Sequence, residues 1–141
     1  MASFGKSSLE KLDTLHPKLR RVMEEAIHHF DFTIVCGYRS KEEQMELFKI
    51  GRTKENGQWK VTGRTVTNID GLSKMSMHNH NPSRAVDIAP YPIDWSDHKA
   101  FKELAKIVKQ SADNVGVKIK WGGDWSKFKD EPHFELDKTE V

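Results

Sequence analysis

The chain is organised around residues 76–87, which read Ser-Met-His-Asn-His-Asn-Pro-Ser-Arg-Ala-Val-Asp. A second segment, residues 130–135, reads Asp-Glu-Pro-His-Phe-Glu and lies far along the chain. Together the two segments supply imidazoles and carboxylates, which are common protein ligands of Zn²⁺. A catalytic zinc site needs three protein ligands and one open position for the water that is activated. The pair of segments therefore favours a zinc hydrolase.

The composition is that of a water-soluble globular protein. A length of 141 residues suits a single domain, and 36% of the residues are hydrophobic. No segment approaches the roughly 18 consecutive apolar residues of a membrane span. The net charge is only +2, and the lysines are interleaved with acids. Nucleic-acid binding would need a concentrated basic face, so we expect neither nucleic-acid binding nor membrane insertion.

The N-terminal residues and the single cysteine indicate the cellular compartment in which the protein is made. The first six residues, Met-Ala-Ser-Phe-Gly-Lys, lack the apolar core and cleavage site of a secretory signal, so we expect synthesis in the cytosol. The single cysteine excludes an intrachain disulfide and a cysteine-rich structural zinc site. Because Cys36 ends the apolar run at residues 32–36, we expect it to be a buried, inert thiol.

Apolar periodicity predicts an α+β fold, with a small antiparallel sheet and helices packed on one side. Helical spacing follows Pro17 and Asp97, and a capping box at Ser40 starts a further helix, whose apolar side is formed by Met45, Leu47, Phe48 and Ile50. Residues 51–75 show no clear periodicity, and we expect a long irregular loop there that forms a wall or lid of a cleft. The predicted strands are residues 32–36, 84–89, 117–121 and 133–136.

Several candidate ligands lie on predicted strands. His133 and Glu135 alternate with Phe134, so both face the same side of one strand. Asp87 lies among apolar residues of another strand, where an acid is costly unless it is paired or bound to a metal. Such positions would mount the ligands rigidly.

Two charged residues are candidates for catalysis. Arg39 lies at a strand-to-helix corner, where side chains commonly point into a cleft, although a surface salt bridge is the alternative. Asp130 lies three residues before His133 and could act as a general base towards water.

The combined motifs resemble the superfamily of zinc D,D-peptidases and L-alanyl-D-glutamate endopeptidases, and in particular its bacteriophage endolysin branch. The shared motifs are Ser-x-His followed by Ala-x-Asp, together with Asp-x-Pro-His-Phe-Glu at residues 130–135. Further matches are Gly-Tyr-Arg-Ser at residues 37–40 with Glu43-Gln44, Gly-Arg-Thr at residues 51–53 and Trp-Gly-Gly-Asp-Trp at residues 121–125. The similarity covers nearly the whole chain.

The resemblance implies a role for each candidate. A single zinc ion in the cleft would be bound by His78, Asp87 and His133. Asp130 would deprotonate the attacking water and then deliver a proton to the leaving amine. Arg39 would stabilise the oxyanion that forms at the scissile carbonyl.

Two histidines compete for the first ligand position. The usual family spacing, counted back from Asp87, selects His80, whereas the Ser-x-His motif selects His78. We favour His78, because residues 81–84 look like a two-residue insertion that leaves the Ser-x-His register intact. The resemblance also gives supporting roles to Glu135 and Trp121, which would orient His133 and pack the floor of the site.

The function that the resemblance implies is hydrolysis of peptidoglycan stem peptides, at the L-alanyl-D-glutamate bond, by a phage-type endolysin that lyses its host. One alternative is a D-alanyl-D-alanine carboxypeptidase, whose cationic pocket Arg52, Arg64 or Arg84 could supply. The other is a non-catalytic, zinc-containing binding module.

The implied setting is the host cytoplasm until lysis and then the cell wall, which lies in the periplasm of a Gram-negative host. We expect a holin-like partner for export, one catalytic domain over residues 1–141 without a separate wall-binding domain, and a monomer.

Overall fold

A four-stranded antiparallel sheet carries most of the candidate residues. The computed structural model describes residues 2–127 and 129–141. The strands lie in the order β1 (Phe32–Cys36), β4 (Ala85–Pro90), β6 (His133–Leu136) and β5 (Ile119–Trp121), and each neighbouring pair is antiparallel. The predicted α+β class and the predicted antiparallel sheet are confirmed.

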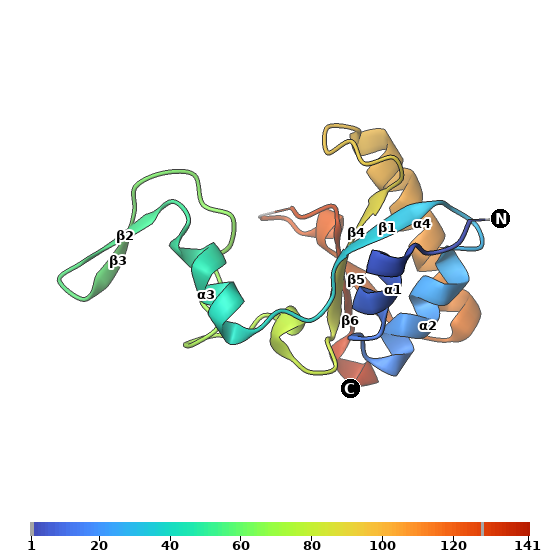
Figure 1. Ribbon diagram of the computed structural model, residues 1–141, viewed down its shortest axis with the longest axis horizontal. Helices are drawn as coiled ribbons and strands as arrows, with labels where there is room; N and C mark the ends of the chain where they lie inside the picture. The colour runs from blue at the N-terminus through green and yellow to red at the C-terminus, as the bar shows by residue number, and fades with distance from the viewer. Residues whose placement is uncertain (1, 128) are drawn as a thin grey trace.

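Three helices cover one face of this sheet (Figure 1). They are α1 (Lys6–Leu12), α2 (Pro17–Ala26) and α4 (His98–Val115). Pro17 begins α2, as predicted, and the Asp97 carboxylate caps α4 by accepting a hydrogen bond from the Ala100 backbone N–H. The core between the sheet and the helices is aliphatic and aromatic, and includes Leu19, Val22, Met23, Phe101, Leu104, Val108, Ile34, Val86, Ile88, Phe134 and Leu136.

Strand alternation separates the core from the candidate site. Val86 and Ile88 on β4 are fully buried against the helices, so Asp87 between them faces the other side of the sheet. On β6, Phe134 is a core residue in the same way, and His133 faces the side of Asp87. Because Asp87 and His133 are register partners, the pairing of β4 with β6 brings the two side chains together.

The pairing of β1 with β4 contains an irregularity that redirects one side chain. Ile34 pairs with Ile88, but Cys36 pairs with Asp87, so one extra residue of β1 is accommodated between them. A bulge of this kind shifts the alternation of side chains. Cys36 is therefore half-buried beside Asp87 and His78, so the prediction of a buried thiol is wrong, while its inertness stays a prediction.

The segment expected to be an irregular loop begins with a β-hairpin. Strands β2 (Arg52–Glu55) and β3 (Gln58–Val61) pair across a two-residue turn, Asn56-Gly57, in which both residues have positive φ. Asn-Gly is the most favourable dipeptide for this tight hairpin turn. Both strands are largely exposed on both faces, so the apolar alternation that normally indicates a strand is missing.

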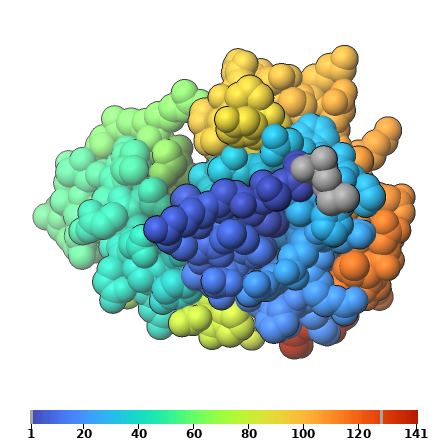
Figure 2. Space-filling view, turned by 45° about the vertical axis from the view of Figure 1, so that its right-hand side comes forward, coloured from blue at the N-terminus to red at the C-terminus, as the bar shows by residue number. Residues whose placement is uncertain are grey.

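The hairpin and α3 (Lys41–Lys49) form a lobe, residues 41–75, that projects away from the helix-covered sheet (Figure 1). Figure 2 shows this lobe, coloured teal to green, at one end of the molecule. Ser40 and Glu43 form the predicted capping box of α3. The only fully buried side chain of α3 is that of Gln44, whereas the predicted apolar residues Met45, Leu47 and Phe48 are half-buried. Ile50 follows the end of the helix and is 48% exposed, so its predicted place on the apolar side is wrong.

The remaining elements are short 3-10 helices, namely η1 (Met77–Asn79), η2 (Gly122–Asp124) and η3 (Lys138–Glu140). Within the described ranges, we find no helix that combines the length and the apolarity needed to cross a membrane.

The position of the core gives a stability prediction. Ile88→Ala should lower the free energy of unfolding by about 2–5 kcal/mol, because it removes buried methyl groups and leaves a cavity. Val61 on β3 is 68% exposed, so Val61→Ala should change the free energy by less than about 0.5 kcal/mol. Urea denaturation followed by circular dichroism measures both values. Equal losses in the two variants would contradict a core confined to the helix-covered face.

Candidate metal centre and active site

Asp87 lies at the centre of the candidate site. Its Oδ1 is 3.3 Å from Nε2 of His78 and 3.3 Å from Nδ1 of His133. The centroids of the two imidazole rings are 5.1 Å apart. The structure therefore brings the three predicted metal ligands together, from η1, β4 and β6.

The outer nitrogen of each ring has its own hydrogen-bond acceptor. Nδ1 of His78 donates to the Gly37 carbonyl at 2.8 Å, and Nε2 of His133 donates to Glu135 Oε1 at 2.7 Å. Because the outer nitrogens are engaged in this way, the inner nitrogens are the ones that face Asp87 and are available to a cation once they are deprotonated. Metal-binding histidines are typically oriented by such partners. The predicted orienting role of Glu135 has this contact in its favour.

Gly37 has to be glycine for this arrangement. A Cβ atom at this position would lie 2.8 Å from the Lys11 carbonyl oxygen and 2.3 Å from Thr14 Oγ1. The close approach of the chain at Gly37 places its carbonyl against His78.

A short cap fixes the choice between the two histidines. Ser76 Oγ accepts a hydrogen bond from the His78 backbone N–H, and Asn79 Oδ1 accepts one from the Ser76 N–H. This cap turns His78 inwards, where its residue is only 2% exposed. His80 follows the cap and is half-buried, with its pKa lowered by burial and by the positive charge of Arg84. The geometry thus brings His78, and not His80, to Asp87.

The donors fall into two overlapping groups that share Asp87. Asp130, Asp87 and His133 offer ligand atoms within 4.8 Å of one another, and so do Cys36, His78 and Asp87. Imidazole nitrogens and a carboxylate oxygen are donors that suit Zn²⁺. The residues present therefore fit the ion that the sequence predicts.

Arg39 points into the site and not into solvent. Its side chain is 17% exposed, and Nη2 lies 3.5 Å from Asp87 Oδ2 and 3.6 Å from Cys36 Sγ. Its backbone N–H donates to the His78 carbonyl at 2.9 Å. Asp87 thus faces the two histidines with one oxygen and Arg39 with the other.

Gln44 is a site residue to which the sequence analysis gave no role. Its Oε1 accepts a hydrogen bond from Arg39 Nη1 at 3.0 Å, and its Nε2 donates to the Ile69 carbonyl at 2.9 Å. The amide therefore connects the lobe to the arginine. The available signal was its helical position, because Gln44 shares a face with Leu47 and Phe48, and an amide on a buried face must find hydrogen-bond partners.

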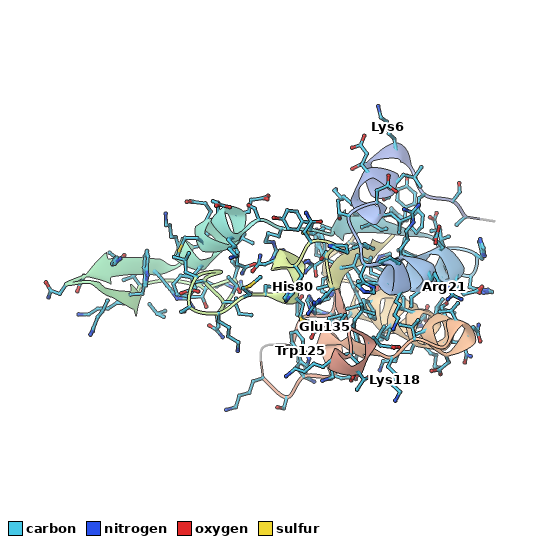
Figure 3. The ribbon with its side chains drawn as sticks, turned by 90° about the horizontal axis from the view of Figure 1, so that it is seen from below. Lys6, Arg21, His80, Lys118, Trp125 and Glu135 are labelled. Atoms are coloured by element: carbon cyan, nitrogen blue, oxygen red, sulfur yellow. The ribbon has the colours of Figure 1, made fainter. Side chains whose placement is uncertain are left out.

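The segment that carries Asp130 is held by Trp121. Nε1 of Trp121 donates to the Glu131 carbonyl at 2.7 Å, while its ring stacks on Phe134. The predicted floor residue therefore also fixes the Asp130 segment. Trp125 packs against His133 with ring centroids 5.1 Å apart. Figure 3 labels Trp125 and Glu135 near the middle of the molecule, where the lobe meets the sheet.

The charges of the site influence one another. Burial disfavours the imidazolium of His78, but hydrogen bonds with Asp87 and Cys36 outweigh burial and raise the pKa of His78 to about 10. Burial also disfavours the Asp87 carboxylate, yet hydrogen bonds with His133 and His78 hold its pKa well below the usual range. For Asp130, desolvation followed by the negative charge of Asp87 raises the pKa. Of the two aspartates, Asp130 therefore holds a proton more readily than Asp87.

A cavity of about 280 Å³ opens onto these residues. Arg39, His78, Asp87, Asp130 and His133 all line it. Its opposite wall includes Val66, Thr67 and Ile69 of the lobe, which agrees with the predicted cleft wall.

Comparison with known proteins identifies the family. The model of the phage L-alanyl-D-glutamate peptidases matches residues 1–139. The chain belongs to this family. The L-alanyl-D-glutamate peptidase of Escherichia phage T5 is 30% identical over 128 residues, which cover 87% of this chain and 81% of that protein. The suspected resemblance to the endolysin branch is thereby confirmed.

Two further proteins support the family assignment. The peptidoglycan L-alanyl-D-glutamate endopeptidase CwlK of Bacillus subtilis strain 168 is 33% identical over 114 residues, which cover 75% of this chain and 60% of that protein. The crystal structure of the Serratia marcescens L-Ala D-Glu endopeptidase ChiX superposes with a TM-score of 0.72 at 27% identity. The superposition covers 97% of this chain and 91% of ChiX.

The ligand assignment predicts that zinc binding needs His133 but not His80. His133→Ala should lose stoichiometric zinc binding, because it removes an inner nitrogen beside Asp87. His80→Ala should bind zinc like the unaltered protein and serves as the matched control. Equilibrium dialysis followed by elemental analysis measures the zinc content. Full occupancy of His133→Ala, or loss of zinc from His80→Ala, would contradict the assignment.

Proposed function

We propose that this chain is a zinc-dependent endopeptidase that hydrolyses peptidoglycan stem peptides at the L-alanyl-D-glutamate bond, as a phage-type endolysin does. Family membership supports the peptidoglycan substrate and the bond. The structural observation that carries the mechanism is the convergence of His78 and His133 on Asp87 in a cleft that also contains Arg39 and Asp130.

Three residues would hold the metal, namely His78, Asp87 and His133. When bound, Zn²⁺ supplies Lewis acidity, which polarises a carbonyl and makes water a nucleophile near neutral pH. The hydrogen bonds to Gly37 and Glu135 keep the two imidazoles in the tautomers that bind a cation. A proton held by either inner nitrogen must leave before the cation binds.

Asp130 is the proposed proton carrier. Its carboxylate accepts a proton from the attacking water and then delivers this proton to the leaving nitrogen. The raised pKa of Asp130 favours this exchange, because a group with a pKa closer to neutral both gains and loses a proton readily. The hydrogen bond from Trp121 to Glu131 keeps the segment in place during the transfer.

Arg39 is the proposed charge-stabilising group. Its guanidinium would balance the negative charge that develops on the scissile carbonyl oxygen. Gln44 and Asp87 fix the guanidinium in advance, so that little reorganisation is needed during the reaction.

The carboxypeptidase alternative has less support. It would use a cationic pocket for the terminal carboxylate, but Arg52 donates to the Phe48 and Thr67 carbonyls and to Asn68 Oδ1, so its guanidinium is occupied in holding the lobe. Neither Arg64 nor Arg84 is among the described residues that line the cleft. The binding-module alternative gives no reason for Arg39 and Asp130 to share the cleft with the ligands.

The proposed setting follows from the substrate. The protein acts at the cell wall, after a holin-like partner has given it access from the host cytoplasm. One chain supplies every proposed site residue, so a monomer suffices for the chemistry.

Mass spectrometry of digested peptidoglycan tests the proposed bond. Zinc-loaded protein should release fragments with new L-alanine carboxyl ends and new D-glutamate amino ends, and a chelator should prevent their release. Release of free D-alanine would replace the proposal with a carboxypeptidase. No cleavage by protein with one zinc per chain would favour the binding module.

The role of Asp130 gives a separate prediction. Asp130→Asn should lower kcat by about 10²–10⁴-fold, because the amide cannot shuttle the proton, while the zinc content stays unchanged. Asp124→Asn is the control, since Asp124 is exposed and pairs with Lys109 on the surface. Rates on purified peptidoglycan and elemental analysis measure both effects. Unchanged hydrolysis by Asp130→Asn would remove Asp130 from the mechanism.

A further inference from the structure

The catalytic cleft continues past Asp130 into a second cavity of about 300 Å³. The two cavities share Asp130, Trp125 and three lobe residues, so they form one groove; the shared lobe residues are Val66, Thr67 and Ile69. The second cavity adds two cationic side chains, Lys74 from the lobe and Lys127 from the segment after η2. The two lysines thus come from the two walls of the groove.

The proposed mechanism gives this groove a direction. Arg39 lines only the first cavity, whereas Asp130 lines both. In the proposed mechanism, Arg39 acts on the scissile carbonyl and Asp130 acts on the leaving nitrogen. The substrate residue that contains the leaving nitrogen therefore extends towards the second cavity. In an L-alanyl-D-glutamate bond, that residue is D-glutamate.

A glutamyl residue inside a peptide carries one free carboxyl group. Its other carboxyl group forms the next peptide bond, and the free one is ionised near neutral pH. We propose that Lys74 and Lys127 bind this free carboxylate of the D-glutamyl residue on the leaving side of the bond, an inference that rests on the proposed function. The recognised chemical class is a carboxylate next to the released amine, in contrast to its neutral primary amide.

The charges lining the second cavity suit this ligand. Lys74 and Lys127 are both exposed, and neither forms an ion pair with any carboxylate in the described part of the chain. Asp130 is the one carboxylate among the described lining residues, and it belongs to the catalytic end of the groove. A substrate carboxylate that lies in the second cavity, away from Asp130, is therefore attracted by Lys74 on one wall and Lys127 on the other.

A tight turn presents Lys74 to the groove. Asp70 Oδ1 accepts hydrogen bonds from the backbone N–H groups of Leu72, Ser73 and Lys74, at 2.8, 2.8 and 3.2 Å. The Gly71 N–H donates to the Lys74 carbonyl at 2.9 Å and closes the turn.

The same turn packs against the helix that positions Arg39. Gly71 has φ +81°, and a Cβ there would lie 3.0 Å from the Lys41 carbonyl oxygen and 3.1 Å from Gln44 Cβ. The backbone from which Lys74 projects is therefore fixed relative to α3 and to the arginine that Gln44 holds.

Exposed charge pairs contribute modestly, so the expected preference is moderate. A substrate with a free carboxylate should be cleaved about three- to tenfold more efficiently than its amide. The difference should appear mainly in KM, because the carboxylate does not change charge during the reaction and is bound similarly in the ground and transition states. Added salt should reduce the preference by screening.

Two synthetic peptides test the proposal, both built as acetyl-L-alanyl-γ-D-glutamyl-lysinamide, so that the free carboxyl group lies next to the amine that is released. In one the free glutamyl carboxyl is an acid, and in the other it is a primary amide. The zinc-loaded protein and the double variant Lys74→Met with Lys127→Met are compared by kcat and KM on both peptides. Lys129→Met is the matched control, because Lys129 lies on the same segment but lines a different cavity beside α4.

The unaltered protein should cleave the acid peptide with a higher kcat/KM than the amide peptide. The ratio of the two kcat/KM values should fall towards one in the double variant and persist in Lys129→Met. Turnover of the amide peptide should stay unchanged in all proteins, which shows that the variants are folded and active. Calorimetry with the cleavage product, as acid and as amide, should give a lower Kd for the acid in the unaltered protein and similar Kd values in the double variant. This measurement needs no turnover.

Three outcomes would count against the idea. Equal cleavage and equal product binding of acid and amide by the unaltered protein would overturn the carboxylate site and leave the proposed function intact. A preference that survives in the double variant would assign recognition to other residues. Failure to cleave both peptides and peptidoglycan would overturn the proposed function, and the carboxylate site with it.

Discussion

The structure depends on one carboxylate held on the open face of a sheet. Asp87 sits between core residues of β4 and is largely enclosed, a position that is costly for a charge without partners. Two imidazoles meet one of its oxygens, and the Arg39 guanidinium meets the other. The register between β4 and β6 places His133 beside Asp87, and the Ser76 cap of η1 places His78 there. The surrounding elements are thus arranged to satisfy a single buried charge.

Much of this arrangement follows from sequence patterns. Alternation in β4 and β6 places Asp87 and His133 opposite the core, and the Ser-x-His motif is a local cap whose hydrogen bond turns His78 inwards. Cys36 could not be placed in this way, because a continuous apolar strand gives no sign of a bulge. The β2–β3 hairpin had a local signal in Asn56-Gly57, but its exposed strands lack alternation.

The lobe shows how a mostly exposed segment can still be coupled to the site. Its strands bury little, so hydrogen bonds have to set its position. Gln44 bridges the Ile69 carbonyl and Arg39, while Arg52 ties the helix end to the Thr67 carbonyl. These long-range contacts could not be read from residue spacing, because they join side chains to backbone groups that only the folded chain brings together.

The two faces of the sheet divide the protein's tasks. Helices α1, α2 and α4 cover one face (Figure 1). The charged residues of the site, Asp87, His133 and Arg39, lie on the other. A substitution among the aliphatic side chains under the helices can change the geometry of the charged site only by shifting the backbone of the strands. Substitutions can therefore tune heat tolerance on one face while the chemistry on the other is preserved.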